Sequence, residues 1–467
     1  MVFHSWVFLI FFAVVYLVFL ATTGTRFRPL TVCRGLTNCW LVIVSYVFYA
    51  WWNPLYLFLI AFSTTVDYTV VLAMARSKRK KPWLLLSVIS NLSLLGFFKY
   101  SAFVAENLNA LFGWLGAGYA VPKPDMLLPV GISFFVFRSL TYSIDFYRGD
   151  VEKEPNFIRY AAFVSFFPHL LCGPIERARN MLPQLRQGER ITRQDITDGL
   201  SLFVTGLFKK VALADYLATY VDEVYGMPDQ YQAPALMLAT FAFAWQIYFD
   251  FSGYTDMARG VARLMGIRTM LNFNDPYLAT GLGDFWNRWH ISLSTWFKDY
   301  VYIPLGGNRK GQVRTYVNMS ITMVISGLWH GAHWTFVTWG ALHAAGRVVT
   351  RELERTSFYR DRVPRRLKQA LVFTFVCFCW IFFRAPSFGE ACLIVKRIFT
   401  SGLADPKFPL LMLGLILSVW AYQFACASRA RRVLELAPVR VGLAVAMLIY
   451  VALFGSSGSQ AFIYFQF

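Results

Sequence analysis

The sequence predicts an all-α protein that crosses a membrane many times. Of its 467 residues, 57% are hydrophobic and only 15% are charged, whereas a soluble globular protein carries about a quarter charged residues. Apolar runs recur along the whole chain, and several approach the ~20 residues that a helix needs to span a bilayer. Basic residues cluster between these runs, as in cytoplasmic loops. We therefore expect roughly ten or more membrane helices, with further re-entrant or interfacial helices.

The apolar segments follow one another from one end of the sequence to the other. The second and third are expected to form a helical hairpin that bends at Asn53-Pro54, because proline ends or kinks a helix. Some later segments are short or polar enough to be tilted or re-entrant. In order, the segments lie near Val2–Leu20, Leu36–Trp51, Leu55–Ala75, Trp83–Phe98, Met126–Phe146, Phe157–Leu171, Leu200–Ala218, Ala233–Phe251, Val317–Leu328, Thr335–Val349, Ala370–Phe383, Pro409–Ala427 and Val441–Leu453.

The basic residues set the expected orientation. No basic stretch precedes the first run, so it does not resemble a cleaved signal peptide. Lys and Arg favour the cytoplasmic side, and their positions place both the N-terminus and the C-terminus outside the cytoplasm. The residues that decide this are Arg26, Arg28, Arg34, Arg76, Lys78, Arg79, Lys80, Lys81, Arg429, Arg431 and Arg432. Since no repeat, soluble appendage or linker interrupts the pattern, residues 1–467 are expected to form one integral membrane domain.

Charge and cysteine content exclude several other classes. The net charge of +19 could suggest nucleic acid, but no basic domain stands apart from the apolar runs. The cysteines are scattered, mostly in apolar runs where free cysteine behaves as a small hydrophobe, so we expect neither a disulfide framework nor a metal cluster. They are Cys33, Cys39, Cys172, Cys377, Cys379, Cys392 and Cys426. The phosphate-binding, dinucleotide-binding and nucleophile-elbow motifs are absent, which disfavours an ATP-driven pump, a dehydrogenase and a serine hydrolase.

Ionisable residues within apolar segments are the first candidates for chemistry. Such residues cost free energy and usually face a cavity, a partner or a substrate. The alternative is a structural ion pair or hydrogen bond that stabilises helix packing, and we favour this alternative for the carboxylates and for Lys99. The candidates are Asp67, Lys99, Arg138, Asp145, Asp250, Asp256, His290, His330 and His333.

The segment Gly327–Trp334 places His330 and His333 three residues apart, between two tryptophans, where two apolar runs meet. A neutral imidazole in such a dry setting can act as a general base near pH 7. The alternative is that one or both histidines cap helix ends. A metal site that includes His343 is disfavoured, because zinc takes three or four ligands and no cysteine or carboxylate lies among these histidines.

The stretch Gly283–Tyr300 shows an apolar stripe at helical spacing that polar residues interrupt too often for a spanning helix. We interpret it as an interfacial or pocket-lining helix. His290 shares a helix face with Trp286 and Leu293 and would meet an aromatic surface, either as a functional group or as a satisfied core histidine. The turn that follows, Pro304–Gly311, carries two cations that could meet a phosphate.

These motifs resemble the membrane-bound O-acyltransferase superfamily. Within it, the match is to the bacterial branch that acetylates alginate, cellulose and peptidoglycan or adds D-alanine to teichoic acid. The resemblance covers essentially the whole chain, and Phe137-Arg138 departs from it, since Phe-Gln is expected there. The motifs that carry it are Tyr46–Trp52, Leu128–Phe135, Tyr142–Gly149, Gly173–Arg177, Phe249–Met257, Phe285–Ser294, Gly327–Gly331 and Phe462–Phe467.

The resemblance implies a bundle of helices around a catalytic tunnel in a bacterial inner membrane. By motif match, His330 is the catalytic histidine and His290 the second histidine of the site. It also implies O-acetylation of an exported polysaccharide such as alginate or cellulose, with periplasmic partners, membrane lipid around the chain and no bound cofactor. The expected donor is acetyl-CoA from the cytosol. Its expected contacts are Trp329, Asn287, Arg288, Lys209, Lys210, Arg309 and Lys310.

Two alternatives remain open at this point. The first is a D-alanyl or peptidoglycan O-acyltransferase of the same family, which differs in donor or acceptor. The second, from another class, is a polysaccharide-linked transporter or flippase in which the histidines relay protons. A transporter would depend on the proton gradient and would form no ester product.

Overall fold

A computed structural model describes residues 1–23, 30–124, 128–171, 173–188, 191–404, 409–426, 428, 431–434, 436–454 and 462–463. Arg26, Arg28, Cys172, Arg429 and residues 464–467 of the closing motif lie outside the described residues. Within them the chain forms helices and no strand, which confirms the all-helical prediction. The chain divides into two compact units: residues 1–203 with 255–270, and residues 204–254 with 271–467. Each has its own core, and one domain over 1–467 stays a prediction.

Five helical segments among the described residues are long and apolar enough to cross a membrane: Trp6–Thr23, Pro54–Arg76, Lys81–Trp114, Ala233–Leu264 and Arg365–Arg384. Gly35–Ala50, Met412–Ala425 and Val441–Leu453 are apolar but shorter. This is fewer than the ten or more spans expected. The difference arises because other predicted runs form helices that are short, as α7 (Phe157–Ser165) is, or that carry charged residues, as α16 (Trp334–Arg355) does.

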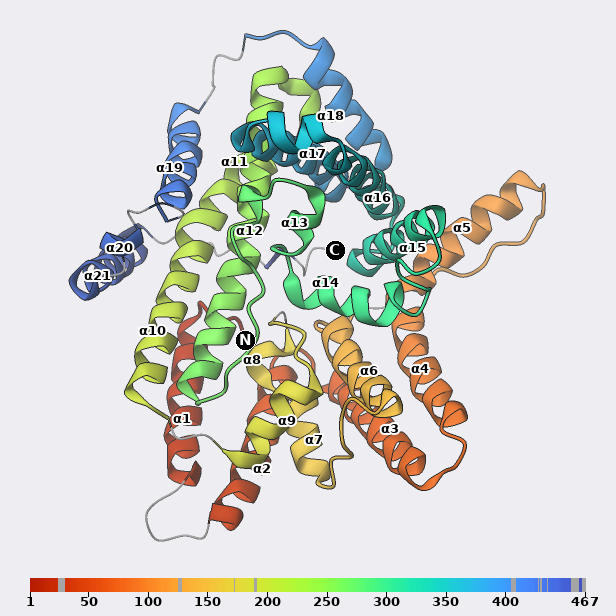
Figure 1. Cartoon of the computed structure of the whole chain (residues 1–467), viewed down its shortest axis with the longest axis vertical. Helices are drawn as coiled ribbons and strands as arrows, with labels where there is room; N and C mark the ends of the chain where they lie inside the picture. The colour runs from red at the N-terminus through yellow and green to blue at the C-terminus, as the bar shows by residue number, and fades with distance from the viewer. Residues whose placement is uncertain are drawn as a thin grey trace. The chain divides into compact units, whose positions relative to one another are not determined.

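In the first unit, helices that are distant in the sequence pack side by side. Helix α2 contacts α1 and α7, while α3, α4 and α6 contact one another (Figure 1). The elements are α1 (Trp6–Thr23), α2 (Leu30–Ala50), η1 (Pro54–Tyr56), α3 (Leu57–Arg76), α4 (Lys81–Leu95), η2 (Gly96–Tyr100), α5 (Ser101–Trp114), α6 (Ile132–Arg148), α7, α8 (Phe167–Leu170), α9 (Ala178–Gln187), the start of α10 (Arg193–Phe208) and the end of α12 (Ala233–Leu264).

Polar groups buried in this unit have structural partners. Asp67 in α3 accepts hydrogen bonds from Ser87, from Asn91 at 2.8 Å and from Ser143 at 3.2 Å. The carboxylate therefore joins α3 to α4 and α6, in agreement with the helix-packing role that we favoured. Arg138 in α6, the cation that departs from the family pattern, is fully buried and donates to the His169 carbonyl at 3.1 Å.

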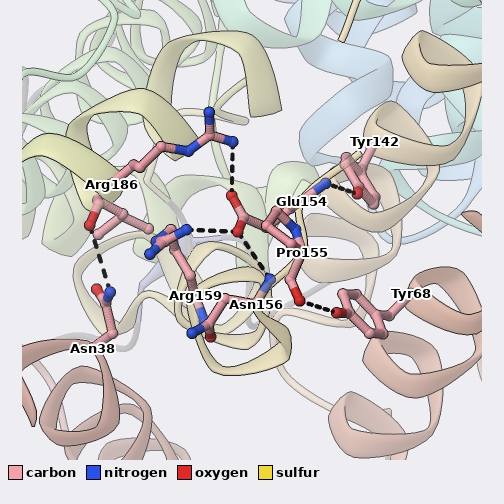
Figure 2. Close-up of polar contacts among 9 residues, drawn as sticks. Asn38, Tyr68, Tyr142, Glu154, Pro155, Asn156, Arg159 and Arg186 are labelled. Carbon is pink, nitrogen blue, oxygen red and sulfur yellow. Dashed lines mark hydrogen bonds and ion pairs between the residues drawn. The ribbon is translucent and has the colours of Figure 1, made fainter. Parts of the chain in front are cut away.

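Glu154 fixes the connection between α6 and α7 (Figure 2). Its fully buried carboxylate pairs with Arg159 at 2.6 Å and Arg186 at 3.1 Å, and it accepts the Asn156 N–H at 3.0 Å. The Glu154 N–H donates to the Tyr142 hydroxyl at 2.8 Å. The buried carboxylate therefore ties the turn to α7 and α9, and the backbone N–H of the same residue ties it to α6.

The second unit contains the two histidine motifs. Helices α15 and α16 form a hairpin, and α16 also packs on α13 and α17 (Figure 1). The elements are the end of α10, η3 (Lys209–Ala214), α11 (Asp215–Gly226), η4 (Pro228–Gln230), the start of α12, η5 (Pro276–Leu278), α13 (Leu282–Trp286), α14 (Ile291–Phe297), η6 (Lys298–Tyr302), α15 (Gln312–His330), α16, η7 (Phe358–Arg362), α17 (Arg365–Arg384), α18 (Phe388–Thr400), α19 (Leu410–Cys426), α20 (Arg431–Leu434) and α21 (Ala437–Phe454).

Two glycines allow α15 and α16 to approach closely. A Cβ on Gly327 would lie 2.2 Å from the Phe336 carbonyl oxygen, and one on Gly340 would lie 2.5 Å from that of Met323. Both obstacles are backbone atoms, which cannot swing away as a side chain can. Small residues at such contacts are typical of helix pairs in membranes. The close packing fixes the end of α15, where His330 lies.

Candidate active site

His330 is the last residue of α15 and lies within an aromatic cage. The centre of its ring lies 5.0 Å from the ring centre of Trp329, 5.1 Å from that of Trp339 and 5.2 Å from that of Phe383, and all three pairs are edge-to-face. His330 is 3% exposed and the three cage residues are also buried. Trp339 comes from α16 and Phe383 from α17. Aromatic walls on several sides exclude water, as a site that must protect an activated acyl group requires.

His290 lies in the turn between α13 and α14, outside the five candidate spans, and adopts a left-handed backbone conformation with φ 41° and ψ 55°. Asp275 is the other non-glycine residue with positive φ among those described. Such conformations cost of order 1–3 kcal/mol and persist where the surroundings over-determine them. At His290 the contact that holds this conformation is with the side-chain carbonyl of Asn272.

Asn272 organises the turn. Its Oδ1 accepts from His290 Nδ1 at 3.1 Å, from the Ser292 hydroxyl at 2.9 Å and from the Ser292 N–H at 3.2 Å. Because Oδ1 is an acceptor, the proton of the neutral imidazole resides on Nδ1 and the lone pair on Nε2. His290 Nε2 is buried with no hydrogen-bond partner among the described residues. Burial lowers the pKa of His290 from 6.5 to about 3, so the ring is neutral at physiological pH.

Trp329 links the two histidines. Its ring lies 6.1 Å from that of His290 and 5.0 Å from that of His330, edge-to-face in both cases. Trp329 is 4% exposed. The two imidazoles therefore flank one indole in a buried aromatic region. This arrangement brings together three of the predicted site residues, and it can hold a neutral base and an oriented polar group close to one reacting centre.

The other two histidines of this region have different surroundings. His333 caps the start of α16 and contacts the Thr335 hydroxyl at 3.0 Å through Nδ1, as one of our two readings expected. His343 is fully buried, and its ring centre lies 4.7 Å from that of Trp339 and 5.1 Å from that of Trp286. Among the described residues, no group of three or more His, Cys, Asp or Glu side chains is placed to hold a metal ion.

The predicted donor contacts separate into two groups. Lys210 is 1% exposed and pairs with Asp215 and Asp250, at 2.8 Å each, so its charge is already compensated. Arg288 pairs with Asp284 at 2.6 Å. Lys210 is thus held in a buried ionic group, whereas the Arg288–Asp284 pair is partly exposed.

The remaining predicted contacts are more accessible. Arg309 and Lys310 are exposed in the turn before α15, and Asn287 is exposed in the turn before His290. Lys209 is half-buried with its ammonium 6.0 Å from the Tyr248 ring centre. Exposed cations in a turn can bind the phosphates of a donor without first breaking an ion pair.

Several residues of the site were not anticipated. Asn272 lies 18 positions before His290. The local sequence marks it only as a polar residue between two apolar ones, which does not predict a contact with His290. Trp339 and Phe383 looked like ordinary apolar residues of spans. The expectation of one continuous helix over Phe285–Tyr300 is wrong, because the chain breaks at residues 287–290 to bring His290 to Asn272. The stripe itself is buried at Phe285, Trp289, Leu293 and Trp296.

Comparison with known proteins identifies the family of this chain. Residues 150–388 match the model of the membrane-bound O-acyltransferase family. The chain is 40% identical to a probable alginate O-acetylase, AlgI, of Pseudomonas putida over 86% of this chain and 81% of the relative, and 40% identical to that of Pseudomonas aeruginosa over 86% and 75%. It is 36% identical to a peptidoglycan O-acetyltransferase of Helicobacter pylori over 76% and 72%. With its apolar helices and histidine motifs, the chain belongs to the membrane-bound O-acyltransferase family and is a membrane O-acyltransferase.

Proposed function

We propose that this protein transfers acetyl groups from acetyl-CoA to an exported polysaccharide such as alginate, with His330 as general base. The observation that carries the proposal is the pair of buried imidazoles on either side of Trp329. The named activities of the relatives from Pseudomonas, which are alginate O-acetylases, support the choice of group and acceptor class. Cellulose is a further acceptor of the same chemistry.

In the proposed reaction, His330 removes the proton of an acceptor hydroxyl as its oxygen attacks the thioester carbonyl carbon. The C–O bond forms, the C–S bond breaks, and the proton passes to the departing thiolate. His290 orients the donor. Since Asn272 accepts from Nδ1 of the resting neutral ring, Nε2 is an acceptor, which can take a hydrogen bond from an N–H or O–H of the donor but cannot donate one to its carbonyl oxygen. The aromatic cage limits hydrolysis of the thioester.

The donor enters from the cytoplasmic side in this proposal, and its phosphates contact Arg309, Lys310 and Lys209, which all belong to the second unit. The immediate acceptor is either the sugar hydroxyl or a serine of a periplasmic partner protein, and both use the same proton transfer. We place the chain in a bacterial inner membrane with both ends of the sequence on the periplasmic side. The three shorter apolar helices are proposed as further spans, which makes eight with the five longer segments.

A specific observation favours a second candidate, peptidoglycan O-acetylation. The relative from Helicobacter pylori with that name is 36% identical over 76% of this chain. The same His330 chemistry would act on a different acceptor. Chemical analysis of both polymers from one set of cells separates the two.

The test replaces His330 with alanine in cells that make the polymer and compares ester-linked acetate at equal membrane levels of the protein. We expect acetate to fall to background while the polymer yield holds. Unchanged acetate would remove His330 from the chemistry. Loss of the polymer itself would favour the alternative of a transporter. His333→Ala is the matched control, because His333 caps a helix and lies outside the cage.

A further inference from the structure

Phe462 and Ile463 return to the middle of α12. Both are buried, at 0% and 2% exposed. The Ile463 N–H donates to Asp250 Oδ2 at 2.7 Å, across 213 positions of sequence. A backbone amide on a buried carboxylate is a charge-assisted hydrogen bond, which is about twice as strong as a neutral one. We refer to Phe462–Ile463 as the docking segment.

Asp250 is held in place from its other side. Lys210 Nζ lies 2.8 Å from Asp250 Oδ1 and 2.8 Å from Asp215 Oδ1, and all three side chains are buried. One oxygen of Asp250 therefore contacts the ammonium and the other accepts the docking segment. Removing one member of a buried ionic group leaves an uncompensated charge and is strongly destabilising, so this carboxylate has a fixed position and orientation.

The docking segment reaches His290 through one aromatic ring. The ring centre of Phe462 lies 4.8 Å from that of Tyr254 and 5.8 Å from that of Phe251. Phe251 follows Asp250 in α12 and meets the His290 ring edge-to-face at 4.7 Å. Phe251 is thus packed between the docking segment and the imidazole. Close-packed interiors transmit small displacements, so the docking segment influences where His290 lies.

We propose that Asp250 is a positioning residue: it docks Phe462–Ile463 onto α12, and the docked Phe462 holds Phe251 against His290. Asp250, Phe462, Ile463 and Phe251 act only through His290 and are not among the residues that the proposed reaction brings to the reacting groups. The role of His290 in this inference rests on the proposed acetyl transfer, whereas the docking itself does not. Asp250 then has a function beyond the helix-packing ion pair that its sequence context predicts.

The docking is tested by thiol labelling of the full-length protein in detergent. Ile463→Cys keeps the backbone N–H and introduces a buried thiol, whose reaction with a maleimide is followed by mass spectrometry of its peptide. We expect slow labelling in this background and labelling at least about ten times faster when Asp250→Ala is added. Asp361→Ala is the matched control, because Asp361 forms an exposed pair with Arg360. Equal labelling in all backgrounds would overturn the docking.

The positioning role is tested with acetyl-CoA as donor, from the release of free CoA by purified protein with de-acetylated alginate oligosaccharide as acceptor probe. Asp250→Ala, Phe462→Ala and Ile463→Pro, which lacks the N–H, are expected to lower kcat about ten-fold while the KM for acetyl-CoA changes less than about two-fold. Ile463→Val keeps the N–H and should restore kcat. Adding Ile463→Pro to Asp250→Ala should lower kcat no further than Asp250→Ala alone, since Asp250→Ala has already removed the hydrogen bond.

The outcomes separate this inference from the proposed function. If the unmodified protein transfers acetyl groups and Asp250→Ala keeps its kcat at normal folded yield, the positioning role is overturned and the function stands. A uniform fall in folded protein with unchanged kcat per folded molecule would also overturn it, as a purely structural ion pair would behave in this way. If the unmodified protein transfers no acetyl group to the oligosaccharide, direct acetylation of the sugar is refuted and the positioning role in that reaction with it, while the labelling still decides whether the segment docks.

Discussion

Replacing Asn272 with alanine should destabilise the second unit and slow acetyl transfer together. The change leaves three buried donors without their acceptor: His290 Nδ1–H, the Ser292 hydroxyl and the Ser292 N–H. A buried donor without a partner costs about 1–3 kcal/mol. Because the three share one oxygen and can relax together, we expect a loss of about 3 kcal/mol in total rather than their sum. The left-handed conformation of His290 also loses the contact that offsets its cost.

The measurement is the midpoint of thermal unfolding in detergent, together with the initial rate of acetyl transfer. A loss of about 3 kcal/mol corresponds to about 6 °C or more for a unit of this size. Asn272→Asp keeps the acceptor, so it should retain the midpoint, while its charge favours a protonated His290 and changes the rate. The exposed Asn308 supplies a control: Asn308→Ala should shift the midpoint very little. If Asn272→Ala unfolds within about 2 °C of the parent and transfers acetyl at the same rate, Asn272 does not hold His290.

Three further predictions concern the packing, the charge state and the donor contacts of the second unit. Gly340→Ala should destabilise by about 2–3 kcal/mol, since the new methyl meets the Met323 carbonyl at 2.5 Å; an unchanged unfolding midpoint would contradict the close packing. The pKa of His290 is about 3 in the folded protein and 6.5 for an exposed imidazole. Between pH 6.5 and pH 3 the unfolded chain therefore binds more protons than the folded one. The free energy of unfolding should fall as the pH drops through this range, by up to about 1.4 kcal/mol per pH unit. Unfolding midpoints against pH, with His290→Gln as the variant that flattens the slope, measure this. Replacing both Arg309 and Lys310 with alanine should raise the KM for acetyl-CoA several-fold with little change in kcat; an unchanged KM would place the phosphates elsewhere.

The sequence was informative where a pattern is repeated. The period and length of the apolar runs predict an all-helical membrane protein, and the interruption at Trp329–Trp334 predicts that the runs corresponding to α15 and α16 are separate helices. The exact end of α15 was less accessible: the helix continues through Trp329 to His330, past the last residue of the expected run. The number of spans was overestimated because an apolar run does not state whether its helix crosses a bilayer or packs within the protein. Tertiary contacts decide between these, and they are not local in sequence.

The site shows the same limit more sharply. The histidines were candidates because ionisable residues are rare in apolar segments, and the resemblance to the family then assigned roles to His330 and His290. The break before α14 was not, because helical spacing continues through it, and the energy that favours the break comes from Asn272, 18 positions away. The pairing of Lys210 with two aspartates was equally hidden, since its carboxylates come from two different elements. A basic residue beside an apolar run looks the same whether it faces a ligand or an internal carboxylate.

Burial alone does not distinguish His290 from His343, but their contacts do. His343 is as buried as His290, and its contacts are with aromatic rings, among them those of Trp286 and Trp339. His290 has a side-chain acceptor at Nδ1, the Asn272 Oδ1. The Asn272 contact determines which nitrogen carries the proton, and the chain accepts a strained backbone to form it. A residue that merely fills space would not need either. The combination of one fixed nitrogen, one open nitrogen and a costly backbone is therefore the physical argument for placing His290 beside His330 in the chemistry.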